Sequence, residues 1–423
     1  MKRYSMLSSL LAIMMLFLVA CGGGSNGSGK VTINWWHIST ADPQLTIFKN
    51  YAAAYMKEHP NVDSKITVIA NDPFKTKLNT AMQAGTPPDI FQSWGGGVLQ
   101  QYAAAGLLKD ITPDLQQSGW GDSFGKAGLD LYSYNGKTYG VPWDLGAVGF
   151  WYNKDLFTKA GITQTPKTWD DFLNVIKQLQ AAGITPLALG EKDEWPGAFY
   201  WEYLAVRIGG QAAFDKAYSH KGGAFTDQPF VQAGQYLQQL VALNPFENGF
   251  LGAAYTDHQA LMGNGQAAME LMGQWAPSGD AASATDKKGP NFGFFPFPTI
   301  PGGAGAPTDV LGGGNGFAIG KNAPPEAVDF VRFMTSADNQ RIMGQQGAAL
   351  PPVKAAQDSV TDPNLQAVAQ LVANAGYYQL YYDQFMSPAV GQVVNDQTAA
   401  LFAGTTSPTA AAKAIDTAAS TGG

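Results

Sequence analysis

The sequence contains little cysteine and little charge. A single cysteine among 423 residues excludes a disulfide within the chain, a CxxC redox motif and a zinc site built from several cysteines. Charged residues make up 14 %, against roughly 25 % in typical soluble domains. Because the formal net charge is -7, the chain lacks the basic excess that neutralises phosphates, and we expect no nucleic-acid partner.

Histidines and cofactor motifs are scarce as well. The four histidines show no HExxH or comparable ligand spacing, so we expect no metal site. Gly22, Gly24 and Gly27 match the dinucleotide-binding GxGxxG pattern, but that pattern requires a preceding strand and a following helix. Here an apolar run precedes the glycines and a glycine- and serine-rich stretch follows them. We therefore expect no cofactor.

What the chain does have is length and aromatic side chains. At roughly 150 residues per domain it is long enough for two large domains, each with its own core. It carries 10 Trp, 17 Tyr and 23 Phe, and it shows no fixed-period repeat, which excludes a solenoid.

The N-terminus has the pattern of a secretion signal. Lys2 and Arg3 precede an apolar run over residues 6–20, which spans roughly 22 Å as a helix and is short for a membrane span. The run ends Leu-Val-Ala-Cys, which resembles a bacterial lipobox. We expect a signal peptide over 1–20, acylation of Cys21, and a flexible tether over 21–30, since two acyl chains give stable anchoring. The alternative is an ordinary signal peptide that happens to end beside the only cysteine.

Strand and helix patterns alternate after the tether. Residues 31–35 and 66–69 read as strands, as do residues 89–92, and apolar residues recur at helical spacing over 45–55 and 74–84. This order predicts βαβ units, and hence an α/β fold whose mainly parallel sheets carry helices on both faces.

The same reading continues to the end of the chain. Residues 267–272 and 316–319 predict buried strands, and residues 169–179 predict a helix. The last residues, 416–423, are expected to be frayed.

Several segments in a fixed order resemble one family. Residues 136–144 read GKTYGVPWD and residues 150–157 read FWYNKDLF; residues 166–172 read PKTWDDF, and residues 313–319 read GGNGFAI. Together with the lipobox, these resemble the extracellular sugar-binding lipoproteins of bacterial ABC import systems, of the maltose and oligosaccharide type. The resemblance covers residues 30–415.

The resemblance implies the two-lobe fold of type II periplasmic binding proteins. Lobe one would comprise residues 30–143 and 305–345, and lobe two residues 144–304 and 346–415, with the ligand in the cleft between them. Cleft binding at the carboxyl ends of parallel strands is a general rule, and two lobes can close around a ligand by a hinge.

A sugar offers apolar ring faces and a rim of hydroxyls, so its site needs aromatic platforms and polar side chains. His37, Asp72 and Trp94 follow the first three strands and are candidates for such a site. His37 could instead lie in the core, and Asp72 could cap a helix. The resemblance implies a stacking aromatic near Trp94, and the glycines at 95–97 would let backbone approach a ligand.

Five further candidates lie later in the chain: Asp144, Trp195, Trp275, Asn315 and Asp383. The resemblance implies a ligand-contacting carboxylate at Asp144, where a hinge salt bridge or a capped turn is the alternative. It also implies an aromatic platform at Trp275, the strongest candidate. Trp195 could instead pack on the surface, and the tyrosines beside Asp383 could form a binding wall or interlobe packing. Asn315 belongs to the glycine-rich stretch at 312–316, another place for close backbone approach.

The sequence favours a receptor over an enzyme. No catalytic motif is present, although carboxylates and aromatics also line the clefts of secreted glycoside hydrolases, which remain the rival. The candidates are acidic or uncharged, which favours a neutral oligosaccharide. By the resemblance, the protein would lack catalytic activity, would be anchored on the outer face of the bacterial cytoplasmic membrane, and would deliver its ligand to an ABC permease. We expect it to be a monomer.

Overall fold

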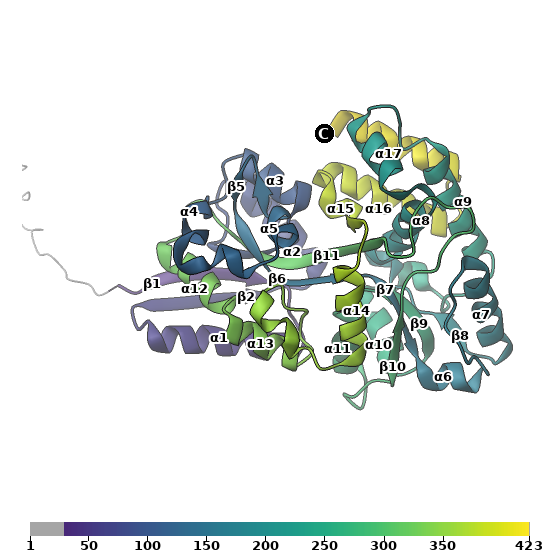
Figure 1. Ribbon diagram of the computed structural model, residues 1–423, viewed down its shortest axis with the longest axis horizontal. Coiled ribbons are helices and arrows are strands. Elements are labelled where there is room, and N and C mark those ends of the chain that lie inside the picture. The colour runs from purple at the N-terminus through teal and green to yellow at the C-terminus, as the bar shows by residue number, and fades with distance from the viewer. Residues whose placement is uncertain (1–28, 423) are drawn as a thin grey trace, which may run out of the picture.

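The computed structural model describes residues 29–422, which form two α/β lobes side by side (Figure 1). The expected signal peptide and Cys21 lie outside the described residues. No helix in the described part of the chain is long and apolar enough to cross a membrane.

The first lobe is built on a sheet with the strand order β12-β11-β3-β1-β2, in which β12 is Tyr378–Leu380. β6 also pairs with β11. β1 (Val31–His37) lies parallel to β2 (Val62–Val68) and to β3 (Ile90–Ser93), as the alternating pattern predicts. Helices α1 (Gln44–Glu58) and α12 (Pro325–Met334) bury their apolar sides on one face. Helices α2 (Asn71–Gln83) and α3 (Gly96–Ala104) do so on the other.

The remaining elements of this lobe are short. They are α4 (Thr112–Leu115), η1 (Gln117–Gly119), η2 (Gly121–Ser123), α5 (Lys126–Asp130), β4 (Ser133–Tyr134), β5 (Lys137–Thr138), α13 (Ala337–Gln345) and η5 (Lys354–Ser359).

The second lobe has a four-stranded sheet in the order β10-β7-β9-β8. β7 (Gly149–Asn153) is antiparallel to both β9 (Ala267–Met272) and β10 (Phe292–Phe295), and only β8 (Thr185–Leu187) runs parallel to β9. The expectation of mainly parallel pairing is wrong for this sheet. β7 enters this sheet from the first lobe through β6, and it therefore runs opposite to β8 and β9, each of which follows a helix of the second lobe.

Helices surround the second sheet. Helix α7 (Trp169–Ala181) begins where the sequence predicts, because the Thr168 side chain accepts from the backbone N–H of Asp171 and the Asp171 carboxylate accepts from that of Thr168. The others are α6 (Lys154–Lys159), η3 (Glu191–Asp193), α8 (Trp195–Ser219), α9 (Gln228–Val241), η4 (Phe250–Gly252), α10 (Tyr255–Gly263), α11 (Ala276–Ser283), α14 (Pro363–Ala373), α15 (Tyr382–Phe385), α16 (Pro388–Phe402) and α17 (Pro408–Gly422).

Two long antiparallel strands cross between the lobes, β6 (Gly140–Ala147) and β11 (Val310–Ile319). Val310 and Leu311 pack in the core of the second lobe, whereas Phe317 and Ile319 pack in that of the first. The pairing shifts by a bulge between Asn315 and Gly316, opposite the Pro142–Asp144 segment. The lobes therefore join at an irregular point of a two-stranded ribbon, which is where a bend is least costly.

The expected lobe boundaries need two changes. Residues 305–311 lead into the second lobe's core, so the third segment of the chain reaches the first lobe only within β11. Leu350 already packs in the second core, but Ala349 and Ala356 pack in the first, so the chain passes from one core to the other gradually and is wholly in the second only from Val360 on. Packing of small alanines carries no local signal of which core they join.

The expected fraying of residues 416–423 is also wrong for the described part of that segment. Helix α17 continues to Gly422, where Ser387 Oγ donates to the backbone oxygen at 2.9 Å. Asp416 accepts from the backbone N–H of Phe225 at 2.8 Å, and Ile415 is buried. Tertiary contacts hold the end of the chain although its sequence is rich in small residues.

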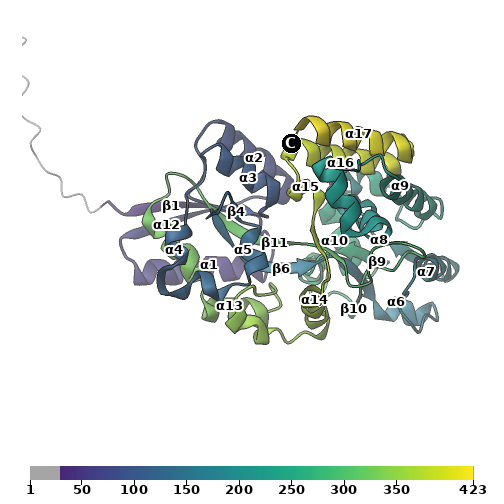
Figure 2. The ribbon, with the colours of Figure 1, turned by 45° about the horizontal axis from the view of Figure 1, so that its top comes forward.

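The glycines at 95–97 and 312–314 allow close packing between segments of the protein. A Cβ at Gly96 or Gly97 would collide with the backbone of residues 384–386, and one at Gly313 would collide with the ring of Tyr381. Figure 2 shows the result, with α15 lying directly beside α3. These glycines allow segments of the two lobes to touch, which corrects the expectation that they admit a ligand.

Candidate functional site

A cavity of about 220 Å³ lies between the lobes, at the carboxyl ends of β1, β2 and β3. Segments from both lobes and from the crossing strands line it: residues 38–42, Gln44, Ala70, Asn71, Lys75, Trp94, Trp143, Trp195, Phe199, Tyr255, Thr256, Gln259, Trp275, Ser278, Gly279, Asn315, Tyr381, Asp383 and Gln384. This position follows the general rule for open α/β sheets. Of the candidates from the sequence, Trp94, Trp195, Trp275, Asn315 and Asp383 reach the cavity.

The second lobe contributes an aromatic wall, formed by Trp195, Phe199, Tyr255, Trp275 and Tyr381. Trp275 Nε1 donates to Tyr255 Oη at 3.0 Å. The Tyr255 ring meets that of Trp195 nearly edge-on at 4.8 Å between centroids, and Tyr381 stands perpendicular to Trp275. Contacts of this kind fix the orientation of the rings, so their apolar faces are preorganised.

Three of these rings stand where a regular element begins or ends. Trp195 and Tyr255 are the first residues of α8 and α10, and Trp275 directly precedes α11, three residues after β9 ends. Side chains at such positions face the cleft instead of the core beneath it.

The first lobe contributes Trp94, which follows β3 and is half-buried. Its ring contacts that of Phe74 edge-on, and Lys75 Nζ lies 5.5 Å from the ring centroid. Lys75 also makes an ion pair with Asp383 at 3.2 Å, so the one basic side chain among the described lining residues is already neutralised. The opposite walls thus both offer tryptophan faces.

Asp144 lies beneath the cavity, not on its surface, which corrects the expectation of a ligand-contacting carboxylate. It is 1 % exposed, and its oxygens accept from Gln274 Nε2 at 2.6 Å, Asn315 Nδ2 at 2.9 Å and the backbone N–H of Leu350 at 2.8 Å. Burial raises the pKa of Asp144 to about 6, against the lowering by these hydrogen bonds. Its role is to tie the crossing strands together.

The contacts of Asp144 extend into both lobes. Gln92 on β3 donates to Asn315 Oδ1 at 2.9 Å, and Asn315 donates to Asp144. Gln274 also donates to Asp144, and Gln274 directly precedes Trp275 of the aromatic wall. A chain of hydrogen bonds therefore runs from the first sheet, through the bulge of the ribbon, to the aromatic wall.

His37 and Asp72 do not line the cavity either. His37 is fully buried between the rings of Trp35 and Phe48, and burial, with a contribution from Lys49, lowers its pKa to about 4. It shares the core-facing side of β1 with Trp35, two residues before it. Asp72 is the second residue of α2, two positions after the N-cap Ala70, so it does not cap the helix.

The sequence analysis missed several lining residues. The tyrosines beside Asp383 were expected to form either a binding wall or interlobe packing, and Tyr381 among them lines the cavity. Tyr255, Phe199 and Trp143 carry no local signal, because only the packing of distant segments decides that they reach the cavity.

The charged residues that line the cavity offer few groups for catalysis or metal binding. Among the described residues, the carboxylates that line the cavity are Asp42 and Asp383, and Asp383 is held by Lys75. No group of three or more His, Cys, Asp or Glu side chains within residues 29–422 is placed to hold a metal ion. The arrangement suits the enclosure of a neutral, ring-faced molecule.

Comparison with known proteins agrees with this geometry. The sequence profile of the bacterial extracellular solute-binding proteins matches residues 41–341. The multiple sugar-binding protein of Streptococcus mutans is 24 % identical over 88 % of this chain and 87 % of its own. The melibiose/raffinose/stachyose-binding protein MelE of Bacillus subtilis is 25 % identical over 79 % and 78 %.

Solved structures show the same architecture. One, from work on xylan utilization by Caldanaerobius polysaccharolyticus, superposes with a TM-score of 0.85 at 32 % identity, over 92 % of this chain and 99 % of its own. A chitin oligosaccharide binding protein gives 0.85 at 28 % identity, over 93 % and 99 %. With a family profile that spans most of the chain and a two-lobe fold around an aromatic cleft, the protein belongs to the bacterial extracellular solute-binding proteins.

Proposed function

We propose that this protein is the sugar-binding component of an ABC importer, which captures a neutral oligosaccharide between its lobes and delivers it to a membrane permease. The observation that carries the proposal is the cavity walled by Trp94 on one lobe and by Trp195, Tyr255 and Trp275 on the other. Relatives named for raffinose, chitin oligosaccharides and multiple sugars support the ligand class.

The arginines support a neutral ligand. Arg207 is buried in the second lobe and donates to the backbone oxygens of Ala306 and Asp309 at 2.9 and 2.6 Å. Arg332 and Arg341 pair with Asp329 and Asp358 on the first lobe. No arginine of the described residues lines the cavity, so a ligand carboxylate or phosphate would lack a bidentate partner.

Capture would proceed by closure about the crossing strands. Ligand contacts with both walls exist only when the lobes are together, and this differential contact is what lets occupancy shift the equilibrium toward the closed form. A permease that docks on both lobes would then distinguish the loaded receptor from the empty one. Attachment through Cys21 would keep a monomeric receptor at the outer face of the bacterial cytoplasmic membrane.

The cleft favours binding over hydrolysis. A glycosidase needs two carboxyl groups flanking the scissile bond, about 5–9.5 Å apart, with one kept protonated. Asp144 is sealed beneath the floor and Asp383 is committed to Lys75. These restraints support a receptor without catalytic activity.

Isothermal titration calorimetry with xylo-, chito-, malto- and raffinose-type oligosaccharides tests the proposal. We expect at least one series to bind with micromolar or tighter affinity, and chromatography of the same mixtures to show the sugars unchanged. Absence of binding throughout the panel would contradict the proposal, and turnover of a glycoside would establish the hydrolase instead.

A further inference from the structure

A buried histidine lies beneath the aromatic wall. His258 stands on α10, one turn after Tyr255, and is 1 % exposed. Its Nδ1 accepts from the backbone N–H of Gly190 at 3.2 Å, and its Nε2 lies 2.7 Å from Glu270 Oε2 on β9. The imidazole is therefore bonded to two other segments of the second lobe.

Each bonded segment leads to a tryptophan of the wall. Gly190 stands five residues before Trp195, and Glu270 stands five residues before Trp275. The histidine's own helix begins with the tyrosine that accepts from Trp275 Nε1. One buried side chain thus connects the segments that carry three rings of the wall.

The hydrogen bonds determine the tautomer of His258. Because a backbone N–H is always a donor, Nδ1 accepts from Gly190 and carries no proton. Nε2 therefore carries the ring proton and donates to Glu270, whose side chain is also fully buried. Both nitrogens are committed, so the ring cannot turn without losing a partner.

The loop that contains Gly190 packs directly on the start of α10. A Cβ at Gly190 would lie 2.7 Å from the backbone oxygen of Ala254 and from the backbone nitrogen of Tyr255. Asp193, at the end of the same loop, accepts through Oδ2 from the Tyr255 N–H at 2.7 Å. The loop and the helix start therefore form one packed unit.

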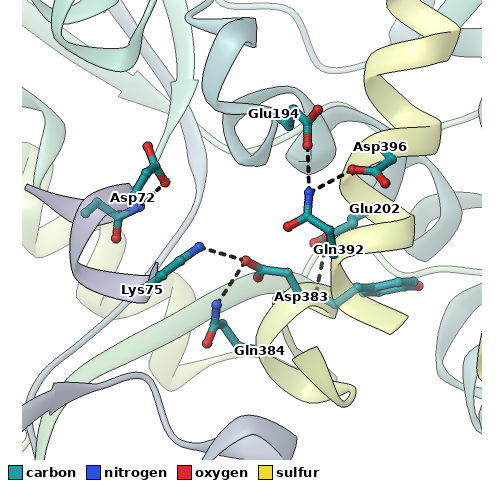
Figure 3. Close-up of polar contacts among 10 residues, drawn as sticks. Asp72, Lys75, Glu194, Glu202, Asp383, Gln384, Gln392 and Asp396 are labelled. Carbon is teal, nitrogen blue, oxygen red and sulfur yellow. Dashed lines mark hydrogen bonds and ion pairs between the residues drawn. The ribbon is translucent and has the colours of Figure 1, made fainter. Parts of the chain in front are cut away.

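Trp195 has no polar anchor of its own in this unit. Its indole Nε1 has no hydrogen-bond partner among residues 29–422. Gln392 Nε2 of α16 donates to Glu194 at 2.9 Å and holds the residue before the ring (Figure 3). The direction of the ring itself is left to its packing on Tyr255 and to the loop that His258 holds.

We propose that His258 is a positioning residue for ligand recognition, which sets the mutual orientation of the wall rings above it. It does not itself line the cavity. Its two nitrogens divide the task, since Nδ1 holds the segment of Trp195 and Nε2 holds that of Trp275. The consequence for ligand affinity rests on the function proposed above.

Fluorine NMR of the ligand-free protein, labelled with 5-fluorotryptophan, tests the positioning directly. Trp195→Phe and Trp275→Phe assign the two resonances. His258→Asn keeps an acceptor near the place of Nδ1 but removes the donor to Glu270, so we expect the larger shift at Trp275. His258→Gln keeps a donor near the place of Nε2 but removes the acceptor for Gly190, so we expect the larger shift at Trp195.

The matched control is Thr398→Val, which also removes a buried hydrogen bond, to the Val394 oxygen at 2.9 Å, on a helix that carries no ring of the wall. It should leave the resonances of Trp195 and Trp275 in place. Trp120, in the core of the first lobe, should be unshifted in every variant. Unshifted Trp195 and Trp275 in both histidine variants overturn the inference, and so does a shift that Trp120 shares, because that indicates a general loosening.

Calorimetry with the tightest-binding sugar of the panel measures the consequence for recognition. Kd should rise about fivefold in either histidine variant. In a Trp275→Ala background, His258→Asn should add less than about twofold, because it acts through the ring that has been removed. The full rise in that background would contradict positioning through Trp275. Failure of every sugar to bind would refute the proposed function, whereas the fluorine resonances would still decide the role of His258.

Discussion

Replacement of Trp275 by alanine tests the aromatic wall most directly. The ring is half-buried, stands against Tyr381 and is oriented by its hydrogen bond to Tyr255. If a pyranose covers roughly 50 Å² of the indole face, burial at about 25 cal/mol per Å² contributes about 1.2 kcal/mol. Stacking adds about 0.5–1 kcal/mol. The total of about 2 kcal/mol corresponds to a roughly 30-fold rise in Kd.

Calorimetry with the tightest-binding oligosaccharide of the panel measures this change. Trp36→Ala is the matched control, because Trp36 is a half-buried tryptophan of β1 that packs under Lys77 and lies outside the cavity. Its Kd should stay within twofold of the unmodified protein. An unchanged Kd for Trp275→Ala, in a variant whose thermal unfolding is cooperative, would remove the ring from the binding surface and refute the assignment of the wall.

Three other changes have defined outcomes. Tyr255→Phe removes the acceptor of the Trp275 N–H at little cost in volume, so Kd should rise about fivefold, for about 1 kcal/mol, in the same titration. Asp144→Ala leaves three buried donors without an acceptor, and urea unfolding should show a loss of about 2–4 kcal/mol; a loss below 1 kcal/mol would contradict its place in the hinge. Gly97→Ala collides with the backbone of α15 and should lower Tm by several degrees, whereas Gly125→Ala, with open space around it, should leave Tm unchanged.

The strand-end rule explains what the sequence could predict. Trp94 and Trp275 follow strands whose bounds were evident from apolar runs, and both reach the cavity. The rule predicts that residues just after a strand lie near the cleft, but it does not predict on which face of the sheet a side chain lies. His37 also ends a strand, but its side chain points the same way as Trp35, into the core under α1. Whether a strand residue faces the core or the cleft depends on which helices cover each face of the sheet, and this is decided by tertiary packing.

The remaining differences come from long-range packing. Asp144 is held by groups 130, 171 and 206 residues away, so no local pattern distinguishes it from a carboxylate that faces a ligand. The gradual return of the chain to the second lobe involves Ala349 and Ala356, small residues that fit either core. The strands and helices themselves agree with their patterns, because each is decided within a few turns of chain.

The hydrogen bond between Gln274 and Asp144 has a consequence for changing the preference of this receptor. The residue beside Trp275 is part of the joint between the lobes, while among the described residues the Trp195 and Tyr255 side chains form no hydrogen bond with Asp144 or Gln274. A library that varies positions 195 and 255 would therefore explore new ligands with the closing motion intact. Variation at 275 risks disturbing recognition and motion together, so evolution toward another sugar meets less resistance from the α8 and α10 side of the wall.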